Sequence, residues 1–155
     1  NTNDHHKKLP PITLITPRKN PIKTIEEAKQ TIDFIRAQYI KNGIGRWAII
    51  DKKTEDFIGW TGLKLEKSLR KEFSYYDLGT DLEKILGKGI ATETAIESLK
   101  YGFEKLDWKE IGAAADINHL ASNNILNKIG LKLIDRFDYE RVQHNWYNIK
   151  KAEWT

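Results

Sequence analysis

The sequence predicts an α+β fold, in which helices flank a mixed and mostly antiparallel sheet. Segments with helical periodicity and segments rich in β-branched and aromatic residues follow in the order helix, three strands, helix, strand, helix, two strands. Helices arranged in this way cover the sheet that the strands form. The chain has 155 residues and shows neither a linker nor an internal repeat. Residues 1–155 are therefore expected to form a single domain with one core.

The first part of the chain is expected to be an irregular lead-in followed by a helix. All four prolines lie within residues 1–23, so this segment is expected to be irregular, or truncated, with residues 12–16 as a candidate short strand. Thr24 and Glu27 form a capping box. Apolar residues then recur at helical spacing, which predicts an amphipathic helix as far as Gly43.

Six strands are predicted from runs of β-branched and aromatic residues that turn-forming residues separate. Gly59 and Gly62 interrupt the second strand, where they either form bulges or let a ligand approach the backbone. The fourth strand is too apolar and too rich in alanine to be an exposed edge. The expected strand bounds are residues 46–51, 57–65, 73–80, 110–117, 131–137 and 142–150.

Two further helices are predicted in the second half of the chain. One follows a loop over residues 81–88 and ends near Leu106. The other is short, with Ser122 as its N-cap and Gly130 as its C-terminal stop. The buried face of the longer helix is marked by Ala95, Leu99, Gly102, Phe103 and Leu106.

The composition excludes several kinds of chemistry. The chain has no cysteine, which removes disulfides, thiolate zinc sites and a cysteine nucleophile. No pair of histidines shows the spacing of metal ligands, so no metal site is expected and the histidines are interpreted as surface residues. They are His5, His6, His119 and His144.

The charge pattern does not favour nucleic-acid binding. The net charge of +4 is a modest basic excess, and glutamates interrupt the densest basic cluster, which is interpreted as a solvated loop. No run of about 18 apolar residues is present. The chain is therefore expected to be cytoplasmic, without membrane or nucleic-acid partners. The basic cluster comprises Lys64, Lys67, Arg70 and Lys71.

A glycine-rich loop directly before a helix is the strongest functional signal. Backbone N–H groups at a helix N-terminus lack intrahelical partners and carry partial positive charge, so they bind phosphate groups. Neither the Walker A nor the dinucleotide-binding pattern fits, because Thr92 stands where the latter needs its third glycine. The residues concerned are Gly87, Lys88, Gly89, Ile90, Ala91 and Thr92.

Together with four other short segments, this loop resembles the GNAT acyltransferase superfamily, in particular the branch of ribosomal-protein N-terminal acetyltransferases. The segments are residues 77–79, 87–93, 101–103, 118–122 and 128–130. The resemblance implies a GNAT-like fold in which the third and fourth strands are parallel neighbours that splay apart around the pantetheine arm of acetyl-CoA. Beyond the loop residues above, it implies cofactor contacts from Leu78, Gly79, Asn118 and Ser122.

The resemblance also implies direct attack of an amine on the thioester. Backbone N–H groups near Leu78 and Gly79 are expected to polarise the thioester carbonyl. Asn118 and Ser122 are expected beside the departing sulfur, with Ser122 as the general acid because its helix has no tyrosine. Asp77 is the preferred base, and a water chain to a backbone carbonyl is the alternative. The other candidate bases are Glu72, Asp116 and His119.

The acceptor is expected to be a primary amine. At pH 7 a peptide α-amine needs about 1.4 kcal/mol to lose its proton, whereas a lysine-like amine needs about 4 kcal/mol. A protein N-terminus is thus the easier substrate, and a small-molecule amine remains open. Trp60, Tyr75 and Tyr76 are candidates for the pocket wall. Departures from the family pattern at Thr80, Asp81 and Leu86 leave a degenerate acyl-CoA-binding module as the alternative. Monomer and homodimer both remain open.

Overall fold

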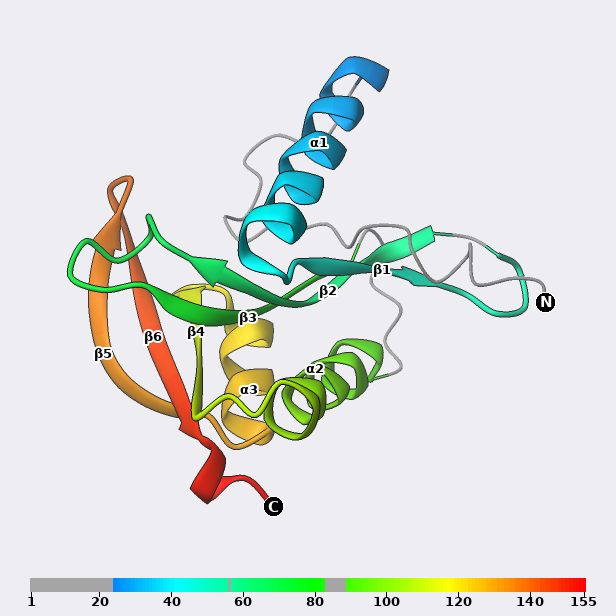
Figure 1. Cartoon of the computed structure of the whole chain (residues 1–155). Helices are drawn as coiled ribbons and strands as arrows, with labels where there is room; N and C mark the ends of the chain where they lie inside the picture. The colour runs from blue at the N-terminus through cyan, green and yellow to red at the C-terminus, as the bar shows by residue number, and fades with distance from the viewer. Residues whose placement is uncertain (1–23, 56, 83–88) are drawn as a thin grey trace.

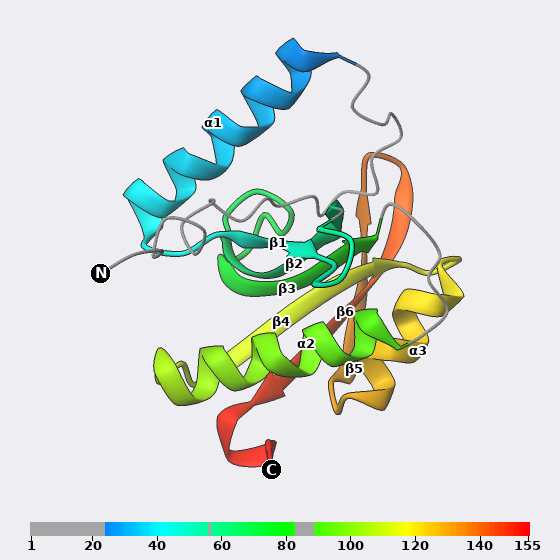
Figure 2. The same ribbon diagram turned by 90° about the vertical axis from the view of Figure 1, so that its right-hand side faces the viewer.

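A computed structural model describes residues 24–55, 57–82 and 89–155, which form a six-stranded sheet with helices on both faces (Figure 1). The strand order is β1-β2-β3-β4-β6-β5. Helices α2 and α3 lie on one face of the sheet, and α1 lies on the other side (Figure 2). The strands are β1 (Arg46–Ile50), β2 (Phe57–Glu66), β3 (Tyr75–Leu82), β4 (Glu110–Asp116), β5 (Lys132–Tyr139) and β6 (Val142–Lys150).

Helix α1 (Ile25–Asn42) has both of the predicted ends. The Thr24 side chain accepts a hydrogen bond from the backbone N–H of Glu27 at 3.1 Å, and Gly43 closes the helix at φ 74°. A left-handed residue at this position is easy for glycine and costly for other residues. The ring of Tyr39 lies over Gly45, and its hydroxyl donates to the Gly45 carbonyl at 2.8 Å. This contact fixes the turn that leads into β1.

The sheet contains one parallel pair, β3 and β4, and all its other neighbours are antiparallel. Strand β3 pairs with β2 along its whole length, from Tyr75 to Leu82. It pairs with β4 only where Asp77 lies opposite Gly112. The predicted fold class is therefore confirmed, including the central parallel pair. The predicted third strand begins two residues too early, because Phe73 belongs to the loop before β3.

Helix α2 (Ile90–Lys100) continues into a π-helical turn, Tyr101–Lys105. The turn is closed by a hydrogen bond from Leu106 N to Tyr101 O at 3.2 Å. Gly102 lies in this turn, where a Cβ atom would come within 2.7 Å of Ile111 Cδ1. Close contact between helix and sheet therefore requires glycine here, and the predicted buried face of this helix is confirmed.

Helix α3 (Leu120–Lys128) begins earlier than the sequence predicts. Its N-cap is His119, whose Nδ1 accepts from the backbone N–H of Ser122 at 3.3 Å. The prediction of Ser122 as the cap is wrong, because His119 takes up this N–H group. Asn123 ties the helix to the sheet: its Oδ1 accepts from Asn145 Nδ2 at 2.9 Å and from the Tyr147 hydroxyl at 2.7 Å.

Two further predictions about exposure are wrong. His144 is only 5% exposed, because it lies on the inner strand β6 and stacks on Phe137 with ring centroids 5.5 Å apart. In the basic cluster, Lys64 and Arg70 are buried. Lys64 pairs with Glu66 at 2.6 Å, and the Arg70 guanidinium pairs with Asp135 at 2.7 Å. Lys67 and Lys71 are exposed, as predicted.

A cluster of buried apolar residues joins the sheet to α2 and α3. Its strand members come from β2, β3, β4 and β6. None of the helices in the described ranges is both long and apolar enough to span a membrane. The fully buried members of the core are Leu63, Leu99, Phe103 and Ile111.

Replacing Leu99 by alanine should lower the free energy of unfolding by about 2–5 kcal/mol, since its side chain is completely buried and the change leaves a cavity. The matched control is Leu120→Ala, because Leu120 is also helical but 71% exposed. Urea denaturation measures both. Equal losses for the two variants would contradict the position of the core.

Candidate active site

The N-terminus of α2 lies at the end of the loop that the sequence predicts to bind phosphate. Gly89 is the N-cap in the left-handed conformation, at φ 69° and ψ 13°, and a Cβ atom there would meet nothing within 4 Å. Ile90, Ala91 and Thr92 form the first turn and are half-buried. Their N–H groups belong to the set that an α-helix leaves unpaired. Gly87, Lys88 and Leu86 lie outside the described residues.

The second part of the site is the place where β3 and β4 meet. Leu78 is buried in the core, on the face of β3 that looks toward α2. Gly79 follows on the opposite face, where a Cβ atom would lie 2.6 Å from Arg46 Nη2. Because no register pair joins the strands beyond Asp77 and Gly112, the last residues of β3 run beside β4 without ladder pairing.

Arg46 and Asp77 form an ion pair that is almost completely withdrawn from solvent, with the two side chains 1% and 0% exposed. Arg46 Nη2 donates to Asp77 Oδ2, and Nη1 donates to the Gly62 carbonyl and, at 3.0 Å, to the Asp77 carbonyl. Burial raises the pKa of the Asp77 carboxyl to about 6, although Arg46 and Lys64 both favour its ionised form. Asp77 is thus a carboxylate that titrates close to neutral pH.

Arg46 is the residue that sequence reasoning missed. Its signal in the sequence is weak, because one arginine at the start of a strand is usually a surface residue. The register supplies the missing information: Arg46 lies opposite Gly62, and Gly62 lies opposite Gly79. Gly79 leaves the space that the guanidinium occupies, whereas a Cβ atom on Gly62 would instead lie 2.7 Å from the ring of Trp47.

The residues after β4 are more exposed. Asn118 is exposed, and its backbone N–H donates to Asp116 Oδ1 at 2.9 Å. Ser122 is half-buried in the first turn of α3. Asp116 and His119, two of the alternative candidate bases, already accept hydrogen bonds from the backbone. Asp116 accepts from the N–H of Asn118, and His119 caps α3. The remaining candidate, Glu72, is exposed and bonded to Arg70 Nε at 3.3 Å.

The three predicted pocket residues divide between the two faces of the sheet. Tyr75 lies on the same face as Asp77, buried, with its ring 5.7 Å from that of Trp146. Tyr76 points to the other face and stacks on Trp108 with centroids 3.6 Å apart. Trp60 is half-buried and lies opposite Asp81 in the register of β2 and β3. Only Tyr75 and Trp60 can therefore share a pocket with Asp77.

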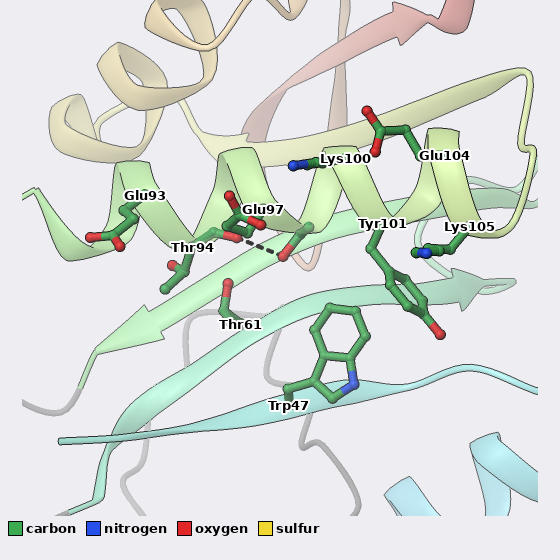
Figure 3. Close-up of a pocket in the computed structure, with 10 residues that line it drawn as sticks. Trp47, Thr61, Glu93, Thr94, Glu97, Lys100, Tyr101, Glu104 and Lys105 are labelled. Carbon is green, nitrogen blue, oxygen red and sulfur yellow. Dashed lines mark hydrogen bonds between the residues drawn. The ribbon is translucent and has the colours of Figure 1, made fainter. Parts of the chain in front are cut away.

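A separate groove of about 410 Å³ runs between α2 and the first two strands (Figure 3). Trp47 and Tyr101 form one wall, with their rings edge to face at 5.0 Å. None of the predicted site residues lines this groove. In the described part of the chain, no three histidine, aspartate or glutamate residues gather closely enough to hold a metal ion. The groove is lined by Trp47, Thr61, Glu93, Thr94, Glu97, Ser98, Lys100, Tyr101, Glu104 and Lys105.

Comparisons with known proteins give one consistent result. A family model described as "Acetyltransferase (GNAT) domain" matches residues 12–132. The chain is 28% identical over 126 residues to "Uncharacterized N-acetyltransferase p20" of Bacillus licheniformis, covering 79% of the chain and 68% of the relative. It is 32% identical over 114 residues to "Uncharacterized N-acetyltransferase YoaA" of Bacillus subtilis, covering 72% of the chain and 62% of the relative. The chain thus spans about two thirds of the length of these relatives.

A solved structure of similar fold is the ribosomal-protein-S5-alanine acetyltransferase of Vibrio fischeri. It is 18% identical, with a TM-score of 0.70, and the match covers 97% of this chain and 83% of the other. This likeness concerns the fold alone.

The raised pKa of Asp77 predicts how stability depends on pH. The value of about 6 in the folded protein exceeds the value of about 3.9 expected for the unfolded chain. Between these pH values the folded state binds more protons, so the contribution of Asp77 to stability falls as pH rises, by about 1.4 kcal/mol per unit. Asp77→Asn removes this slope, and its stability relative to wild type should rise between pH 4 and 6.

Urea denaturation at several pH values measures this effect. Asp107→Asn is the control of opposite sign, because Lys151 holds the pKa of the Asp107 carboxyl below its usual range. The contribution of Asp107 is lost as pH falls, so this variant should lose relative stability as pH rises. A constant difference between wild type and Asp77→Asn would show that Asp77 does not titrate in this range.

Proposed function

The chain belongs to the GNAT family of acetyltransferases, and we propose that it transfers an acetyl group from acetyl-CoA to a primary amine by direct attack. The family assignment confirms the resemblance that the sequence motifs carry and makes this domain an acyltransferase. The single observation that best supports the reaction is the geometry at Asp77. There, a buried carboxylate lies at the point where β3 and β4 separate.

The residues at the start of α2 fit the diphosphate of acetyl-CoA. Gly89 places no side chain in front of the first helical turn, and the N–H groups of Ile90, Ala91 and Thr92 are available to an anion. Within this proposal Gly87 and Lys88 complete the loop, and Asn118 and Ser122 contact the pantetheine end. Bound acetyl-CoA supplies the activated carbonyl carbon, whereas the protein supplies orientation and proton transfer.

Three groups of the protein carry the proposed chemistry. Backbone N–H groups near Leu78 and Gly79 stabilise negative charge on the carbonyl oxygen. Asp77 accepts the proton that the amine loses, and a pKa of about 6 makes it a carboxylate at pH 7. Ser122 donates a proton to the leaving sulfur. Its hydroxyl is not needed as the helix cap, because His119 has that role.

A protein or peptide α-amine is the acceptor that this site favours. A base with a pKa of about 6 removes a proton more easily from an amine of pKa near 8 than from one near 10.4. The similar fold of an acetyltransferase named for ribosomal protein S5 alanine agrees with this choice. The wall of the acceptor pocket is assigned to Trp60 and Tyr75, with Tyr76 on the far face. A small-molecule amine is the competing acceptor.

The alternative is a degenerate module that binds acyl-CoA without turnover. One observation favours it: Asp77 is fully buried and already paired with Arg46, so an acceptor cannot touch it directly. Assays of thiol release with peptides, polyamines and lysine derivatives decide between the two. Cofactor binding without turnover on any acceptor would establish the alternative.

Gly89→Val should abolish the thermal stabilisation that coenzyme A gives to the protein, because valine strains the left-handed N-cap and disturbs the anion-binding N–H groups. For the wild type this stabilisation is about 2.7 kcal/mol at a hundredfold excess over Kd. Gly43→Val is the matched control, since Gly43 has φ 74° and also has open space around it. Both variants lose intrinsic stability, but only Gly89→Val should lose the coenzyme A shift.

Ser122→Ala should lower kcat by about 10²-fold or more, because the leaving thiolate loses its proton donor. The apparent affinity for coenzyme A should change little, and calorimetry measures it separately. Asn124→Ala, an exposed change in the same helix, is the control. Unchanged kcat in Ser122→Ala would remove Ser122 from the mechanism.

A further inference from the structure

Four buried side-chain atoms have no hydrogen-bond partner in the described part of the structure. They are Arg46 Nε, Asp77 Oδ1, the Tyr75 hydroxyl oxygen and Trp146 Nε1. Folded proteins leave few buried polar atoms without partners, so each such atom needs an explanation. Because these four side chains are close neighbours, a single explanation should account for all of them.

The four side chains form a continuous row, which we call the buried polar row. Arg46 is ion-paired with Asp77. Asp77 and Tyr75 stand two residues apart on β3, so both side chains lie on the same face. The rings of Tyr75 and Trp146 meet edge to face at 5.7 Å. The row thus crosses the sheet from β1 to β6.

Two glycines beneath the buried polar row leave room for its side chains. A Cβ atom on Gly79 would lie 2.6 Å from Arg46 Nη2, and one on Gly112 would lie 2.7 Å from Tyr75 Cδ2 and 3.2 Å from Trp146 Nε1. Gly112 is also the residue of β4 that faces Asp77. The row therefore rests on the backbone at the one point that joins β3 to β4.

Arg46 holds one oxygen of Asp77 and leaves the other open. Its Nη2 donates to Oδ2, while its Nη1 donates to the carbonyls of Gly62 and Asp77. The same guanidinium thus orients the carboxylate and the backbone of β3. Oδ1 remains an acceptor, and Trp146 Nε1 and Arg46 Nε remain donors. A water molecule can accept from such donors and donate to Oδ1.

We propose that Arg46 is a positioning residue for acyl transfer, which holds Asp77 as a carboxylate whose Oδ1 receives the proton of the attacking amine through a water bound in the buried polar row. The inference rests on the function proposed above. The amine nitrogen forms a bond to the acetyl carbon, and the bond from that carbon to sulfur breaks. The amine proton passes to Oδ1, Ser122 protonates the sulfur and recovers its proton from solvent, and Arg46 keeps its own protons.

The charged and titratable groups around Asp77 come from three strands. Arg46 belongs to β1, Lys64 and Glu66 belong to β2, and Tyr75 belongs to β3, while β4 contributes Gly112. Burial and Glu66 raise the pKa of Asp77, and Arg46 is the largest influence that lowers it. Burial, and next to it Asp77, raises the pKa of the Tyr75 hydroxyl, so Tyr75 stays neutral. Removing the Arg46 cation should therefore raise the pKa of Asp77.

The test compares Arg46→Met and Arg46→Lys with wild type. The pH dependence of kcat is measured with acetyl-CoA and a peptide acceptor, and the Asp77 carboxyl is titrated by carbon-13 NMR without ligands. We expect the acid limb of kcat and the NMR titration to rise together by about one pH unit or more in Arg46→Met. Arg46→Lys keeps the charge, so its titration should move less while its kcat still falls. KM for acetyl-CoA should be unchanged in both.

Arg70→Met is the matched control, because Arg70 is also a buried arginine, and it pairs with Asp135 at 2.7 Å. It should lose stability without shifting the acid limb. Tyr75→Phe and Trp146→Phe remove single contacts to the proposed water and should lower kcat while leaving coenzyme A binding intact. Should Arg46→Met fail to fold, Arg46→Lys and these two variants decide.

Two results would overturn the proposal. One is an unchanged Asp77 titration in the folded Arg46 variants, and the other is an acid limb that moves equally in Arg70→Met. The failure of the proposed function is recognised separately, as the absence of wild-type turnover on any amine. In that case the NMR titration still decides whether Arg46 sets the protonation of Asp77.

Discussion

The pairing of one guanidinium with one carboxylate inside the sheet is the constraint on which the rest of this structure depends. Neither the Arg46 nor the Asp77 side chain is exposed to bulk solvent, and a single buried charge without its partner is strongly destabilising. The pair therefore dictates its surroundings. Gly79 must lack a side chain, because a Cβ atom there would lie 2.6 Å from Arg46 Nη2, and β1, β2 and β3 must keep the register that brings Arg46 across them. Stability and the candidate active site thus share the same residues.

The helices and most strands could be predicted because their signals are local. The cap at Thr24, the glycine at position 43 and the apolar spacing of α2 act over a few residues each. The sequence predicts the wrong N-cap for α3. Both His119 and Ser122 are compatible with a helix start, and the structure shows that His119 is the cap. The predicted start of β3 at Phe73 is too early, because Phe73 lies in the preceding loop, from which it packs against Tyr75 and Trp146.

The exposure of polar residues could not be predicted, because it depends on partners distant in sequence. Arg70 is buried by Asp135, which lies 65 residues further along the chain, and His144 by the neighbouring strand β5. The site shows the same division. The start of α2 could be predicted because the glycine before it is a local signal, whereas Arg46 requires knowledge of which strands are neighbours. The groove beside Trp47 and Tyr101 was missed for the same reason.

The single register pair between β3 and β4 makes the sheet two units that are hydrogen-bonded internally and only narrowly joined to each other. On the side of Tyr75, the junction is reinforced by side chains. The Arg70 guanidinium lies 4.9 Å from the ring of Phe73, 4.7 Å from that of Phe137 and 5.5 Å from that of Trp146. The contacts of Arg70 with these three aromatic rings therefore provide most of the side-chain packing that holds the two units together at this end. Toward Leu82, the last residues of β3 have no ladder partner in β4, so the two units can move apart at that end without breaking any antiparallel ladder.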